Sequence, residues 1–337
     1  MNIKKIGLTA LAGSLVATSA YAGELSLSGS AVLSYSDYSG TEATSINGTT
    51  VTTNTTELAA AESPWGMDQE ITASGSGELD NGWVVSLSHA LGASGSGSTT
   101  SSITIDMGDA GSLTYADQDA GGGLRSLKDI VPTAWEEATD GPVNENQANM
   151  GSGPGFAYSV SVAGASVGIQ YSEALAGAAN VNDGGVSTSG TDDGSSSSIG
   201  VQYPIGDSGL MVYGGMGTVS KADGKDVDHD TIGVKYTFGA FSVGAQVNDQ
   251  DDADTSGTDL ETTIMGISYM INENLSVSYG NHSTAKTGSP DQEIDSIQAA
   301  YSMGGIGVKV QNSQGDNMRN TAGKTSEKTE VAISFAF

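Results

Sequence analysis

Apolar and small polar residues alternate with a period of two along most of this chain. In the first such segment, which starts at Glu24, leucine and alanine lie on one face and serine on the other. A period of two is typical of β-strands, whose successive side chains point to opposite faces. The serine face, with Ser26, Ser28 and Ser30, is too polar for the core of a β-sandwich. The pattern therefore predicts strands that separate an apolar environment from water.

Sixteen such segments can be counted, and the connections between them alternate strictly in length. Seven are tight turns, such as the one with Asn81 and Gly82, and eight are longer segments rich in Asp, Gly, Ser and Thr. After the first strand, the expected strands are Gln69–Gly77, Trp83–Ala90, Ser101–Met107, Ser112–Tyr115, Phe156–Val162, Ser166–Tyr171, Ser196–Tyr203, Gly209–Gly217, His229–Phe238, Phe241–Asn248, Glu261–Met270, Leu275–Asn281, Glu293–Met303, Ile306–Gln311 and Ser326–Phe337. An even number of antiparallel strands, with short turns at one rim and long loops at the other, is typical of outer-membrane barrels.

Tyrosines occur at equivalent places in four of these strands, just before a tight turn. They are Tyr203, Tyr236, Tyr269 and Tyr301. A ring of tyrosines at one rim is typical of a membrane interface. Closure of the sheet gives every backbone N–H and C=O group in the lipid a hydrogen-bond partner. A barrel of sixteen strands is wide enough to leave an aqueous channel. The sequence predicts an all-β fold, a 16-stranded antiparallel transmembrane β-barrel.

The N-terminus has the pattern of a secretory signal peptide. Lys4 and Lys5 precede a short apolar run, and Ala20-Tyr21-Ala22 fits a cleavage site. We therefore expect residues 1–22 to be removed and residues 23–337 to form a single barrel domain in the outer membrane, reached through the periplasm. Without the two lysines, ten of the 12 basic residues remain against 40 acidic ones, a net charge of −30. This charge argues against nucleic acid as a partner and is compatible with cationic solutes or divalent ions.

Three histidines and two short motifs are candidates for a catalytic or metal site. The histidines at 89, 229 and 282 form no ligand pair at short spacing and are expected to be solvated rim residues. Gly164–Gly168 matches G-x-S-x-G at a hairpin turn, without the strand–turn–helix context that a nucleophile needs. A calcium-loop pattern starts at Asp252 but has Thr263 where the bidentate Glu is required. We expect no catalytic residues, no metal site and no cofactor, and leave open weak divalent-cation binding by the acidic loop with Asp249, Asp251, Asp252 and Asp254.

Four segments resemble a known family. Val331–Phe337 ends on an aromatic residue after alternating apolar positions, as in Gram-negative outer-membrane proteins. Gly23–Gly29 is similar to the first strand of trimeric general-diffusion porins, especially those of alphaproteobacteria. Gly111–Asp119 resembles the family's fifth strand leading into its third loop, and Tyr236–Gly244 a recurrent hairpin.

The resemblance implies a homotrimer of sixteen-stranded barrels whose third loop folds inward, and passive diffusion of small hydrophilic solutes and ions. The third long connection, Ala116–Gly153, is also the one segment that does not repeat the strand pattern. As its constriction residues we expect Asp119, Arg125, Lys128, Asp129, Glu136, Glu137 and Asp140. The expected pore-wall residues are Lys235, Lys309, Gln202, Gln246 and Gln298, with Lys328 added by strand parity. Porins of this type usually carry an arginine cluster on the wall, whereas the only arginines here are Arg125 and Arg319.

The sequence therefore predicts an outer-membrane diffusion channel rather than an enzyme. Its acidic excess favours cations and neutral solutes over anions. A substrate-specific channel is the first alternative. The second is a secreted calcium-binding β-rich surface protein, for which the repeated nonapeptide is missing.

Overall fold

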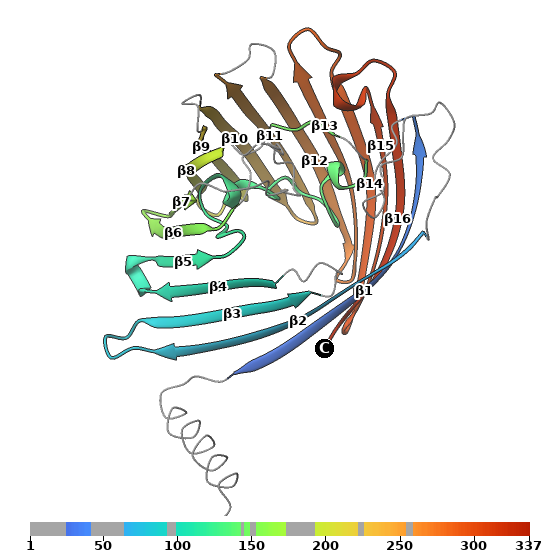
Figure 1. Ribbon diagram of the computed structural model, residues 1–337. Helices are drawn as coiled ribbons and strands as arrows, with labels where there is room; N and C mark the ends of the chain where they lie inside the picture. Colours follow the sequence, from blue (N-terminus) through green and yellow to red (C-terminus); the bar gives the residue numbers. More distant parts are fainter. Residues whose placement is uncertain are drawn as a thin grey trace, which may run out of the picture.

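The protein is a closed β-barrel (Figure 1). This computed structural model describes residues 25–41, 64–92, 99–142, 145–148, 153–172, 193–221, 226–253 and 259–337. Within these ranges the sheet contains sixteen strands, each antiparallel to the strands before and after it in sequence, and β1 pairs with β16. The predicted fold class and strand number are therefore confirmed. The predicted signal peptide, residues 1–22, lies outside the described residues and stays a prediction.

Every expected strand has a counterpart in the structure. The strands are β1 Ser26–Gly40, β2 Trp65–Glu78, β3 Val84–Gly92, β4 Thr99–Asp106, β5 Ser112–Ala116, β6 Gly155–Val162, β7 Ala165–Ser172, β8 Asp193–Pro204, β9 Leu210–Lys221, β10 Val227–Phe238, β11 Phe241–Asp252, β12 Leu260–Asn272, β13 Leu275–Lys286, β14 Gln292–Met303, β15 Ile306–Asp316 and β16 Thr325–Ala336. Four short 3-10 turns complete the described secondary structure: η1 Gly108–Ala110, η2 Gly123–Leu127, η3 Ala138–Asp140 and η4 Met318–Asn320. In the described ranges no helix is long and apolar enough to span a membrane.

The outer face of the wall is apolar, as the alternation predicts. On β10, the outward side chain of Ile232 is 69% exposed, and Val234, Tyr236 and Phe238 share its face. Near the tight turns, aromatic rings stack across neighbouring strands, with centroids 5.5 Å apart for Phe238 and Phe241 and 4.4 Å apart for Phe241 and Tyr269. The predicted tyrosines all lie on this exposed outer face. They form the aromatic girdle that a membrane interface favours.

The strands continue further toward the long connections than the sequence predicts. β11 ends at Asp252 rather than Asn248, β13 at Lys286 rather than Asn281, and β15 at Asp316 rather than Gln311. The expected loop starts were wrong because the backbone ladder continues above the apolar band, where outward side chains such as Asp249 are polar. Asp249, Asp251 and Asp252 thus belong to a strand, and Asp254 lies outside the described residues.

The connection between β5 and β6 lies within the barrel (Figure 1). Leu124, Leu127 and Ile130 form a buried apolar cluster with Tyr213, an inward-facing residue of β9. A second cluster joins Ala138 of η3 to Ile294 of β14 and Met318 of η4. These two clusters fix the described part of this connection against the inner face of the wall at two places.

Candidate channel constriction

The first half of the β5–β6 connection packs on β7, β8 and β9. The backbone N–H of Leu124 donates to Ser198 Oγ at 3.1 Å, and Gln202 Nε2 donates to the carbonyl of Ser126 at 2.9 Å. The approach is close because glycines meet: a Cβ on Gly200 would lie 2.3 Å from the carbonyl oxygen of Gly123. Gly123 itself has φ 55°, a conformation that glycine adopts without strain. Small residues on both surfaces therefore allow this backbone-to-wall contact.

Both cations of this segment form ion pairs with neighbouring carboxylates. Arg125 Nε lies 2.9 Å from Asp119 Oδ2, and Arg125 is only 8% exposed. Lys128 Nζ lies 2.6 Å from Asp129 Oδ2. Asp119 also accepts the backbone N–H of Gly121 at 2.8 Å, which orders the turn before η2. The positive charges are thus largely offset within the loop.

The second half of the segment is held by polar side chains of β13 and β14. Gln298 Oε1 accepts the backbone N–H groups of Trp135 at 2.9 Å and Glu136 at 3.2 Å. Its Nε2 donates to the carbonyl of Glu136 at 2.6 Å. Ser278 Oγ accepts the N–H of Ala134 at 2.8 Å. Since these wall residues pair with backbone groups, they fix the path of the loop.

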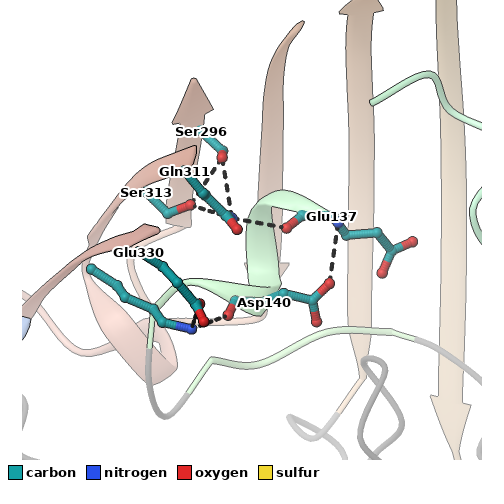
Figure 2. A network of polar contacts seen from close by, with 7 residues as sticks. Glu137, Asp140, Ser296, Gln311, Ser313 and Glu330 are labelled. Carbon is teal, nitrogen blue, oxygen red and sulfur yellow. Dashed lines mark hydrogen bonds and ion pairs between the residues drawn. The ribbon is translucent and has the colours of Figure 1, made fainter. Parts of the chain in front are cut away.

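The turn η3 is bound to β14, β15 and β16 (Figure 2). Gln311 Nε2 donates to the carbonyl of Glu137 at 3.3 Å, and it also contacts the hydroxyls of Ser296 and Ser313. Asp140 Oδ2 accepts the N–H of Glu137 at 3.1 Å, within a capping box. Lys328 forms an ion pair with Glu330 and lies 3.4 Å from the carbonyl of Asp140. The network places a wall cation and several carboxylates next to each other.

A pocket of about 500 Å³ opens on this side of the loop. It is lined by Lys128, Asp129, Thr133, Trp135, Glu136, Glu137, Thr139, Asp140, Pro142 and Glu145. Burial, with Asp140 and Glu330 nearby, raises the pKa of Glu136 from 4.5 to about 7. Burial also raises the pKa of Glu145. Five carboxylates and one lysine therefore surround a single pocket, which can attract cations.

Acidic residues also occur on the inner face of another strand, β2. On β2, Asp68 and Glu70 alternate with the outward-facing Met67 and Ile71, so they point to the interior. Both are exposed. Asp68 was not predicted, because the expected strand started at Gln69. Glu70 lies within that expected strand, and its parity with Ile71 could have identified it.

The predicted pore-wall residues all lie on the inner face, in two different environments. Lys309 Nζ lies 5.6 Å from the centre of the Trp135 ring, and Lys235 is half-buried on β10. Gln246 and Gln298 are only 6% and 3% exposed, because the loop covers them. Gln298 therefore binds the loop, and neither Gln246 nor Gln298 borders open water.

The prediction of solvated histidines was wrong for two of the three. His229 and His282 face the interior and are 5% and 3% exposed. His282 Nδ1 lies 3.4 Å from Nε2 of Gln147, a residue of the β5–β6 connection. In the described residues, no three His, Cys, Asp or Glu side chains are grouped as metal ligands.

The sequence matches the family model described as Gram-negative porin over residues 7–336. The chain belongs to the Gram-negative porin family. In a comparison with curated proteins, none matches. As a porin, the protein forms a channel across the outer membrane, and its family and fold are those of non-enzymatic channels.

Solved porin structures share the fold of this porin at low sequence identity. The anion-selective porin from Comamonas acidovorans has a TM-score of 0.63 at 13% identity, covering 94% of this chain and 100% of that one. Salmonella typhi OmpF in complex with daunomycin has a TM-score of 0.64 at 15% identity, covering 94% and 98%. A mutant porin of Rhodopseudomonas blastica has a TM-score of 0.56 at 16% identity, covering 93% and 100%.

Proposed function

We propose that this porin allows passive diffusion of ions and small hydrophilic solutes and prefers cations and neutral solutes over anions. The observation that supports this most is the presence of carboxylates on two parts of the lumen. One group lines the loop pocket, and the other, Asp68 and Glu70, lies on β2. Clefts lined by one sign of charge concentrate ions of the opposite sign.

The cations near the constriction reduce the negative potential of these carboxylates only slightly. Arg125 and Lys128 are each paired with a carboxylate, and Lys328 is paired with Glu330. Lys309 is a further wall cation next to the loop, beside Trp135. We assign the constriction to Asp119, Arg125, Lys128, Asp129, Glu136, Glu137 and Asp140, with Lys235 and Lys309 on the wall.

Selectivity does not follow from the barrel fold. The Comamonas porin, which has a similar fold, is described as anion-selective. Two barrels of one shape can differ in selectivity because the lumen side chains set the local potential. The argument for cations therefore rests on the acidic residues of this chain alone.

The reversal potential across a planar bilayer in a KCl gradient tests the proposal. We expect a cation-selective potential that decreases as salt screens the charges. Replacement of Asp68 by Asn together with Glu70 by Gln should reduce the preference. The matched control replaces Asp80 and Asp207, in two tight turns at the rim, by Asn. A wild-type channel that prefers anions contradicts the proposal.

A substrate-specific channel is the second candidate, favoured by the mixed chemistry of the loop pocket. Trp135, Thr133 and Thr139 add an aromatic face and hydroxyls to the carboxylates. Current block that saturates with the concentration of one solute would support this candidate over general diffusion.

We also propose a homotrimer that works without a cofactor. The family resemblance of the first strand and of the loop supports the trimer. Single-channel recordings should then show conductance steps in groups of three, whereas single independent steps would contradict it.

A further inference from the structure

An apolar depression lies on the outer wall across β8 to β11. It has a volume of about 1070 Å³. Its outward residues include Ile199, Val201, Val212, Met216, Ile232 and Val247. This face is turned away from the channel.

The depression exists because its centre carries no side chain. Gly214 of β9 lies opposite Val201 of β8 and opposite Ile232 of β10. Ala245, another small residue, faces the same side one row below on β11. Larger residues, among them Val201, Ile232 and Val247, surround these two positions, so the wall is hollowed between them. Glycine within a strand can mark a site where a ligand or another backbone approaches closely.

Carboxylates lie directly above the depression, toward the long connections. Asp230 of β10 is opposite Asp249 of β11, which in turn is opposite Glu261 of β12. Like charges in direct cross-strand contact destabilise a sheet. In the described part of the chain, no Lys, Arg or His forms an ion pair with these three residues. A cation from outside the chain would offset the repulsion.

The height of these carboxylates relative to the membrane follows from the topology. The aromatic girdle lies near the tight turns, and the long connections of such barrels are extracellular. Asp230 and Asp249 therefore stand above the apolar band on the extracellular side. That position is the level of lipid headgroups in the outer leaflet.

We propose that the depression binds one membrane lipid with an ammonium-bearing headgroup. One acyl chain lies over Gly214 and Ala245, and the ammonium group contacts Asp230, Asp249 and Glu261. Apolar burial holds the chain, and charge complementarity selects the headgroup. An anionic headgroup would be repelled by the same three carboxylates.

Lipid retention by the purified full-length barrel, measured by native mass spectrometry, tests this proposal. The probes are phosphatidylethanolamine and phosphatidylglycerol with identical acyl chains, each added to the detergent-solubilised protein. We expect phosphatidylethanolamine to be retained about tenfold better. Replacement of Asp230 and Asp249 by Asn and of Glu261 by Gln should abolish that preference. The control removes outward carboxylates away from the depression, with Glu293→Gln and Asp295→Asn, and should keep it.

Filling the depression should weaken retention of both lipids. Ala245→Leu is the variant of choice, because a Cβ on Gly214 would lie 2.9 Å from the carbonyl of Thr231 and disturb the sheet. Ala299→Leu, on the outward face of β14, is the matched control and should bind lipid as the wild type does.

Three results would overturn the proposal. The first is equal retention of the two lipids by the wild type. The second is retention of phosphatidylglycerol that depends on calcium and disappears with EDTA, since a bridging divalent ion would then be the ligand. The third is loss of an oligomer in Ala245→Leu, because a second copy of the chain would then cover the depression. None of these outcomes changes the reversal potential, so the selectivity proposal is tested separately.

Discussion

Gly29 and Phe337 exchange two backbone hydrogen bonds, 2.8 and 3.0 Å long, and so connect β1 to the last residue of the chain. The ring of Phe337 lies against the glycine: a Cβ at position 29 would be 2.4 Å from its Cε2 atom. Glycine at this place lets the aromatic ring rest on the closing strand.

Replacement of Gly29 by Val should weaken barrel closure. The new side chain displaces the exposed Phe337 ring, which costs less than overpacking a core, about 1 kcal/mol at most. The folded band on an unboiled gel should convert to the unfolded band at a lower temperature. Gly75→Val on β2 is the control, since its Cβ would come no closer than 3.9 Å to Leu25. Equal conversion temperatures for the two variants would contradict a special role for position 29.

Replacement of Gly200 by Ala should lift the first half of the loop from the wall. The added Cβ would lie 2.3 Å from the carbonyl oxygen of Gly123, which belongs to the backbone and cannot turn away. We expect a changed single-channel conductance and a loss of about 1–3 kcal/mol of stability. Gly280→Ala, another inward glycine beneath the loop, has 3.8 Å of space and should behave as the wild type.

The selectivity of the channel should depend on pH through Glu136. Its pKa is raised to about 7, chiefly by burial, so the side chain is neutral below this pH and negative above it. Cation preference should therefore increase as the pH rises through about 7. The reversal potential measured between pH 5.5 and 8.5 follows this change, which Glu136→Gln should remove and Glu273→Gln, in an exposed turn, should not.

The same pKa shift has a defined effect on stability. Because the folded protein holds the proton of Glu136 more tightly than the unfolded chain, protonation stabilises the folded state. This contribution is present below about pH 4.5 and is lost as the pH rises to about 7. Wild-type unfolding temperatures that rise more steeply over this range than those of Glu136→Gln would contradict the assignment.

Removal of Lys128 should change the ion selectivity of the channel, whereas removal of Arg125 should lower its stability. Lys128→Gln leaves Asp129, whose side chain is 56% exposed, without its counter-charge and should increase cation preference. Arg125→Gln breaks a buried ion pair with Asp119 and should cost about 3 kcal/mol of stability. Reversal potentials and thermal unfolding of both variants distinguish these effects. No change in selectivity for Lys128→Gln would place its charge outside the ion path.

The strands could be predicted because their pattern is local. On β10, the alternation from Thr231 to Phe238 gives the two faces correctly, since each residue contacts only lipid or the interior. The strand ends were less predictable. Polar residues such as Asp249 and Asp251 continue the ladder of β11 without an apolar signal, so their pattern is that of a loop.

The environment of inward residues depends on contacts distant in sequence. Gln298 and Gln311 look like lumen residues by parity, but they bind backbone groups of Glu136 and Glu137 more than 160 positions earlier. His282 is buried beside Gln147 for the same reason. No local pattern indicates which part of a polar wall a loop will cover.

The β5–β6 connection touches the wall from β7 to β16, through Ser198 near one end and Lys328 at the other. An empty ring of strands can flatten into an ellipse at little cost, because its hydrogen bonds bend without breaking. A segment attached to more than half of the circumference opposes that deformation. The loop should thus keep the cross-section of the barrel from flattening, and the ion current should vary little with lateral tension in the membrane.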